Sequence, residues 1–195
     1  MSSDPLVRLQ SLFRETVASH ERFAASQLPA LVAAADAISR SLDAGGKVLA
    51  FGNGGSASDA QHLVAELVGL FEAERRSLAG LALTADSNVV TAIANDYGYE
   101  AVFTRQVEGL GRPGDVAVGI STSGRAPNVL AGLVAARKAG LMTIALTGRD
   151  GGPIGAAAEI HINVADQSTA RVQEVQRTIL HAVCALVEGR LAVQV

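Results

Sequence analysis

Short apolar runs alternate with helical patterns through most of this 195-residue chain. The apolar runs, which read as buried strands, cover residues 47–52, 81–84, 115–122, 142–148 and 160–164. Helical segments are predicted at about 57–72, 87–95, 100–110 and 127–139, followed by a long helix over 169–191. Strands that alternate with helices in this way predict an α/β fold, with a parallel sheet covered by helices on both faces.

The stretch before the first strand has helical spacing only. Leu and other apolar residues recur every three or four positions over residues 5–43, which predicts two helices, and Ala44-Gly45-Gly46 stops the second. The chain has no internal repeat, low-complexity stretch or linker. We therefore expect one domain over residues 1–195, in which an N-terminal helical segment, 1–46, precedes a three-layer, doubly wound, five-stranded parallel sheet.

Charge and hydropathy exclude several classes of partner. The net charge is -3 and Lys and Arg form no run, so neither a nucleic-acid footprint nor a basic membrane-binding helix is visible. No apolar run reaches the length of a membrane span, and the N-terminus lacks the apolar region of a signal peptide. The sequence predicts a cytoplasmic protein without nucleic-acid or membrane partners.

The apolar content also bears on assembly. The chain is 49% hydrophobic but only 4% aromatic, a composition of Ala, Val, Leu and Gly that suits close packing of helices on a sheet and burial between subunits. The single cysteine, Cys184, excludes an intrachain disulfide and lies in an apolar stretch typical of a core position.

A Gly-rich turn follows the first predicted strand, with the sequence GNGGSASD over residues 52–59. It formally matches G-x-G-x-x-A, but the second strand ends near Asp86, too far along for the acidic residue of a dinucleotide site, and no P-loop lysine follows. The helix after this turn places Asp59, His62 and Glu66 on one face, because their spacings are three and four residues. That face is either solvated or turned toward a ligand crevice.

Three consecutive hydroxyl residues, Ser121, Thr122 and Ser123, follow the third predicted strand. A helix N-cap needs only one of them. Hydroxyls together with free backbone N–H groups form an anion site, so this loop favours a phosphate. Ligands of open α/β sheets bind at the carboxyl ends of the strands, where this loop and the Gly-rich turn both lie. The sequence therefore predicts a phosphorylated small molecule as ligand.

The remaining polar candidates are less specific. Gln173 and His181 lie eight residues apart on the last helix, with Arg177 between them, and a lone His among apolar neighbours is usually a core residue. Asn95 and Asp96 end a predicted helix, where they form either a helix cap and turn or a polar contact to the ligand. Residues 147–148 and 150–152 have turn chemistry without a predicted catalytic role.

Together these segments resemble the sugar isomerase (SIS) domain, and within it the phosphoheptose isomerases. The resemblance covers nearly the whole chain and rests on five stretches: GNGGSASDAQHLVAEL (52–67), TAIANDYGYEAVF (91–103), RPGDVAVGISTSG (112–124), ALTGRDGG (145–152) and ARVQEVQRTILHAV (170–183). The glycine turn and the S-T-S-G loop are common to many SIS domains. The set His62, Glu66, Gln173 and His181 is more specific to the isomerases.

The resemblance implies the conversion of sedoheptulose 7-phosphate into D-glycero-D-manno-heptose 7-phosphate, the entry step to nucleotide-activated heptose. It implies a homotetramer with active sites between subunits. It also implies a zinc ion held by His62, Glu66, Gln173 and His181. The positions that match substrate contacts are Asn53, Gly54, Gly55, Glu66, Asn95, Asp96, Ser121, Thr122, Ser123 and Gln173.

Three positions depart from the family pattern. The phosphate loop commonly continues Asn-Ser-Pro-Asn, whereas here it reads Arg125-Ala126-Pro127-Asn128, so Ala126 supplies no hydroxyl. Arg125 compensates with its charge, or the choice of substrate has shifted. Gln176 stands where a His is common, and no role follows for it.

Aldose–ketose isomerisation moves a proton between neighbouring carbons through an enediol, work that suits a positioned carboxylate and an imidazole. We expect Glu66 to be the base and His181 to move protons between the two oxygens. A zinc-bound His cannot act freely as an acid, so the role of His181 as ligand, acid–base or both stays open. The alternatives are a non-catalytic sugar-phosphate or replication-initiator-associated SIS module, and an isomerase of another phosphosugar.

Overall fold

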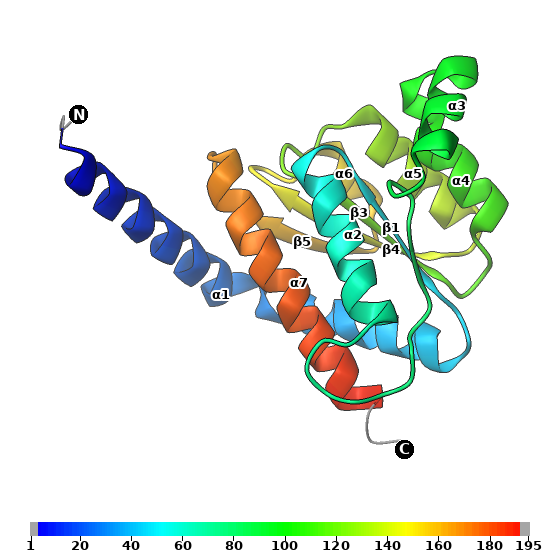
Figure 1. Cartoon of the computed structure of the whole chain (residues 1–195), viewed down its shortest axis with the longest axis horizontal. Coiled ribbons are helices and arrows are strands. Elements are labelled where there is room, and N and C mark those ends of the chain that lie inside the picture. The colour runs from blue at the N-terminus through cyan, green and yellow to red at the C-terminus, as the bar shows by residue number, and fades with distance from the viewer. Residues whose placement is uncertain (1–3, 192–195) are drawn as a thin grey trace.

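The sheet of the computed structural model, which describes residues 4–191, is parallel throughout and has the strand order β2–β1–β3–β4–β5 (Figure 1). The strands are β1 (Val48–Gly52), β2 (Gly80–Ala82), β3 (Val116–Ser121), β4 (Met142–Gly148) and β5 (Ile160–Val164). The helices are α1 (Pro5–Asp43), α2 (Gly55–Val68), α3 (Ser87–Tyr97), η1 (Tyr99–Ala101), α4 (Val102–Leu110), α5 (Pro127–Lys138), α6 (Gly152–Ala157) and α7 (Thr169–Leu191). All five predicted strands are present.

Helices cover both faces of the sheet, which confirms the predicted three-layer fold. Successive side chains of a strand point to opposite faces, so Val48 and Ala50 join one core with α1, α2 and α7. Leu49 and Phe51 join a second core with α4 and α5. Every residue of β1 and β3 is buried, which explains why these strands read as continuous apolar runs.

The prediction of two N-terminal helices was wrong. Residues Pro5–Asp43 form one helix that passes through Pro29, although an interior proline removes a hydrogen bond and crowds the preceding turn. Phe23 and Leu31, on either side of Pro29, are buried in the same core, so packing holds the helix together through the proline. Its first half reaches beyond the sheet (Figure 1), where Thr16 donates to Glu174 of α7 at 2.8 Å.

The direction of the strand order reverses between β1 and β3, and ligands of doubly wound sheets bind at this point. The Gly-rich turn follows β1 and the hydroxyl loop follows β3, so the two predicted binding segments are neighbours. The two strand ends are close, since a Cβ on Gly52 would lie 2.7 Å from the Ile120 carbonyl oxygen. Among residues 4–191, no helix is long and apolar enough to cross a membrane.

Candidate active site

The turn after β1 is fixed from two sides. Gly54 has φ 57° and ψ -120°, a conformation that L side chains rarely adopt, and it turns the chain directly into α2. The side-chain amides of Asn53 and Asn128 exchange hydrogen bonds of 2.8 and 2.9 Å, and the Tyr99 hydroxyl donates to Asn53 at 3.1 Å. Asn53 is thereby held at the start of α5, at the edge of the candidate site.

The hydroxyl loop after β3 packs against the loop after β4. The Ser121 and Ser123 hydroxyl oxygens lie 3.4 Å apart, and Ser123 accepts from the Arg125 backbone N–H at 3.2 Å. The Arg125 guanidinium forms an ion pair with the Asp150 carboxylate. The backbone makes the tightest contact, because a Cβ on Gly124 would lie 2.2 Å from the Gly151 carbonyl oxygen.

This contact predicts the effect of Gly124→Ala. Gly124 has φ +66° and backbone atoms as its closest neighbours, so a methyl group there must push the two loops apart. We expect phosphate binding to weaken about tenfold, the loss of one charge-assisted hydrogen bond. Titration of the variant with inorganic phosphate measures this. Gly109→Ala is the control, since a Cβ there meets nothing within 4 Å; equal phosphate affinity in both variants would contradict the assignment.

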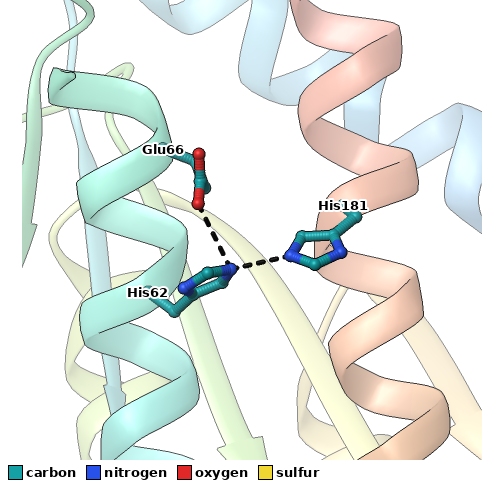
Figure 2. A group of neighbouring side chains, drawn as sticks. All are labelled: His62, Glu66 and His181. Carbon is teal, nitrogen blue, oxygen red and sulfur yellow. Dashed lines mark hydrogen bonds and ion pairs between the residues drawn. The ribbon is translucent and has the colours of Figure 1, made fainter. Parts of the chain in front are cut away.

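The most reactive group of side chains lies further along α2, opposite α7. His62 and Glu66 of α2 and His181 of α7 point toward one another (Figure 2). The two Nε2 atoms of His62 and His181 are 2.8 Å apart, and Glu66 Oε1 lies 3.3 Å from His62 Nε2. One potential ligand atom from each of the three residues falls within 4.8 Å of the others. The predicted polar face of α2 is therefore turned toward α7.

The electrostatics of this group favour a neutral His62 imidazole. Burial lowers the pKa of His62, the Arg177 guanidinium and His181 lower it further, and only the Glu66 carboxylate opposes them. Since two imidazole nitrogens face each other at hydrogen-bond distance, one carries a hydrogen and the other offers a lone pair. Two neutral imidazoles and a carboxylate are a donor set that fits a divalent metal such as zinc, and the same set fits proton transfer.

The other predicted site residues lie outside this group. The Gln173 amide lies against the start of α2, where a Cβ on Gly55 would come within 2.0 Å of its Nε2 atom. Asn95 donates to Asp96 at 2.8 Å on the exposed α3, and within residues 4–191 no hydrogen bond links either one to His62 or Glu66. The structure therefore brings together three of the four predicted metal ligands and places Gln173 against the start of α2.

Two contacts beside the site were not expected. The Phe71 ring, from the loop after α2, lies 5.5 Å from the His181 ring, and an apolar residue in a loop gives no sequence signal for this contact. Asp59 is buried and pairs with Arg177 at 2.8 Å. Burial raises the pKa of Asp59, and Arg177 opposes that shift. The spacing 59–62–66 indicates a shared face, but nothing local indicates a cation opposite it.

The family model of the SIS domain matches residues 12–148. The chain belongs to the SIS domain family. It is 53% identical over 163 residues to the phosphoheptose isomerase of Geotalea daltonii, which covers 84% of this chain and 85% of that one. It is 48% identical over 183 residues to the phosphoheptose isomerase of Aquifex aeolicus, with 94% and 96% covered.

A solved structure agrees with these sequence relatives. The phosphoheptose isomerase from Neisseria gonorrhoeae has a TM-score of 0.90 and 42% identity, covering 95% of this chain and 100% of that chain. The predicted resemblance and the α/β fold are confirmed, and this SIS-domain protein is an isomerase. The alternative of a non-catalytic module is set aside, because the isomerase relatives match nearly end to end.

Proposed function

We propose that this isomerase converts sedoheptulose 7-phosphate into D-glycero-D-manno-heptose 7-phosphate through an enediol, the first step toward nucleotide-activated heptose. The observation that carries the proposal is the meeting of Glu66 with His62 and His181 between α2 and α7. The phosphoheptose isomerases to which the chain is similar support the choice of a heptose phosphate.

The phosphate end of the substrate is assigned to Ser121, Thr122 and Ser123. From Gly55 at the start of α2, His62 lies seven residues further on, roughly 10 Å along the helix axis. A seven-carbon sugar phosphate can bridge that span, with its phosphate at the strand edge and its carbonyl end at the His–Glu group. In this placement the backbone of the Gly-rich turn lies beside the sugar carbons, and the other proposed contacts come from Asn53, Gly54, Gly55, Asn95, Asp96 and Gln173.

Glu66 acts as the base in this scheme. Its carboxylate takes the proton from C1 of the ketose and returns it to C2, while His181, where no metal holds its ring nitrogen, moves a proton between the two oxygens. The side chain of Glu66 is 19% exposed, so a proton that it holds is partly shielded from exchange with bulk water. Transfer by one carboxylate predicts that part of the label at C1 of the substrate reaches C2 of the product.

We further propose that His62, Glu66 and His181 hold a zinc ion; the predicted fourth ligand, Gln173, lies eight residues before His181 on α7, about two helical turns away. The donor set supports the assignment, although an amide is an uncommon zinc ligand. Bound zinc supplies Lewis acidity toward the substrate's oxygens. The chain's own part is to make the two imidazoles converge and to keep that of His62 neutral, which its lowered pKa favours.

The proposed assembly is a homotetramer with sites between subunits. Two unpartnered surfaces support it. Helix α3 has no buried residue, and the outer half of α1 exposes large apolar side chains, including Leu6, Leu9 and Phe13. A cytoplasmic location and the lack of nucleic-acid or membrane partners stay predictions of the sequence.

The decisive experiment is product identification from sedoheptulose 7-phosphate, with chelator-treated protein and with zinc restored. We expect the heptose 7-phosphate as product, loss of activity on chelation and recovery with zinc. A panel of other ketose phosphates, including arabinose-type and hexulose phosphates, runs in parallel because Ala126 leaves the choice of substrate open. Turnover of another sugar alone would overturn the substrate, and full activity of zinc-free protein would overturn the metal.

A further inference from the structure

Helices α2 and α7 run side by side in the same direction from the binding edge of the sheet (Figure 1). Three contacts cross the seam between them at successive turns. They join Gly55 to Gln173, Asp59 to Arg177, and His62 to His181. The spacings of about four residues on each helix match one helical turn, so the two helices are held level with each other.

The middle contact is the charged one, and its carboxylate is buried. The Asp59 side chain is 5% exposed and the Arg177 side chain 37%, and Arg177 Nη2 lies 2.8 Å from Asp59 Oδ1. The apolar contacts that surround the seam are not directional, so they do not by themselves fix how far one helix slides along the other. An ion pair with a buried carboxylate does, because sliding would leave that charge without its partner.

We propose that the Asp59–Arg177 ion pair is a positioning device that sets the register of α7 against α2 and so brings His181 opposite His62. The pair lies one turn before each histidine. A displacement of one ångström between reacting groups lowers the rate on the order of 10²-fold. A contact that fixes the register close to the two histidines therefore protects the rate. Residues that orient metal ligands typically change metal affinity by about 10–100-fold when they are replaced.

The test replaces the pair with apolar residues, Asp59→Leu with Arg177→Met. A buried ion pair can be exchanged for apolar residues of similar volume without loss of stability, so this variant removes the restraint while the protein stays folded. The matched control is Asp36→Leu with Arg190→Met. It removes another ion pair of α7, with Arg190 Nη2 2.5 Å from Asp36 Oδ1, which joins α7 to α1 instead of α2.

Each variant is compared with wild type in four ways. Chelator competition gives the zinc affinity, steady-state kinetics give kcat and KM, thermal unfolding gives Tm, and a crystal structure gives the spacing of the two histidines. We expect an unchanged or higher Tm, zinc affinity lowered about 10–100-fold, kcat lowered with KM little changed, and a wider spacing between the His62 and His181 Nε2 atoms. The control should match wild type in zinc affinity and kcat. Wild-type zinc affinity and spacing in the test variant would overturn the proposal, as would a higher KM alone, which marks Arg177 as a substrate contact.

The proposal rests on the proposed function for its zinc and kinetic readouts, whereas the crystallographic spacing is independent of it. If wild-type protein binds no zinc, the metal assignment fails and the Nε2 spacing still decides the register. Should the double variant not fold, Arg177→Lys replaces it, because lysine keeps the charge on a flexible stem without the planar fork. That variant should lose zinc affinity to a smaller extent, and wild-type affinity in it would overturn the proposal.

Discussion

Replacing Glu66 with Gln should lower kcat by about 10²–10⁴-fold, the contribution of a positioned general base. The substitution keeps the size of the side chain, and an amide oxygen can still accept a hydrogen bond from His62, 3.3 Å away in the native protein. What the variant loses is the ability to accept a proton from carbon. Steady-state kinetics with sedoheptulose 7-phosphate, together with transfer of deuterium from C1 to C2, measure that loss directly.

The matched control is Glu74→Gln, which changes an exposed carboxylate in the loop after α2. It should retain wild-type kcat and Tm. Zinc content of the Glu66 variant, measured alongside, separates its two proposed roles. A variant with zinc retained and kcat lost supports the base, whereas loss of both assigns the defect to the metal site. Near-normal turnover in the Glu66 variant would exclude the mechanism.

The sequence predicts where the Glu66 carboxylate lies on its helix better than it predicts which residues surround that carboxylate. The spacing of Asp59, His62 and Glu66 fixes a common helical face, because helix geometry is local. Which residues face that side chain depends on how α7 packs against α2, more than a hundred residues later in the chain. Only the family resemblance predicts that His181 belongs with His62, since a lone histidine in an apolar helix otherwise reads as a core residue.

Strands were predictable for the same local reason. Fully buried parallel strands are largely apolar, which holds for β1 and β3, whereas β2 and β5 are only partly buried. The proline in α1 illustrates the opposite case. A local rule ends a helix near Pro29, but Phe23 and Leu31 pack into one core across it, and long-range packing decides the outcome. Buried charges far from any motif, such as Arg75 and Glu188, gave no sequence signal.

That last pair carries the largest expected effect on stability. The Glu188 carboxylate of α7 accepts backbone hydrogen bonds of 2.9–3.1 Å from Phe71, Glu72 and Ala73, and its Oε1 lies 3.1 Å from Arg75 Nε. The two side chains are only 1% and 4% exposed. Arg75 in turn donates to backbone carbonyls at the end of α2, including that of Glu66 at 2.5 Å. The pair thus ties the loop after α2 to α7.

Replacing Glu188 with Gln should therefore destabilise the protein by about 3–5 kcal/mol, because it leaves the Arg75 guanidinium buried without a counter-charge. For a chain of this size the expected fall in Tm is on the order of 10 °C. Thermal and urea unfolding measure it at fixed protein concentration. Asp150→Asn breaks the exposed pair with Arg125, whose side chains are 56% and 63% exposed, and should cost less than about 1 kcal/mol.

The effect of Glu188 also depends on pH. Burial alone would raise the pKa of this carboxyl, but the backbone N–H groups of Phe71, Glu72 and Ala73 together with Arg75 outweigh it, and the pKa lies below its ordinary value of 4.5. The folded state then binds the proton less readily than the unfolded state. Its stabilisation is fully present above the unfolded pKa and is lost as the pH falls through the folded pKa.

The gap in unfolding free energy between wild type and the Glu188→Gln variant should therefore be constant from neutral pH down to about 5 and narrow below that. The same loop carries Phe71 against the His181 ring, so loosening it should also reduce kcat at temperatures where the variant is still folded. A variant within about 1 kcal/mol of wild type at neutral pH would show that the loop is held by its other contacts, chiefly those of Arg75 to the end of α2.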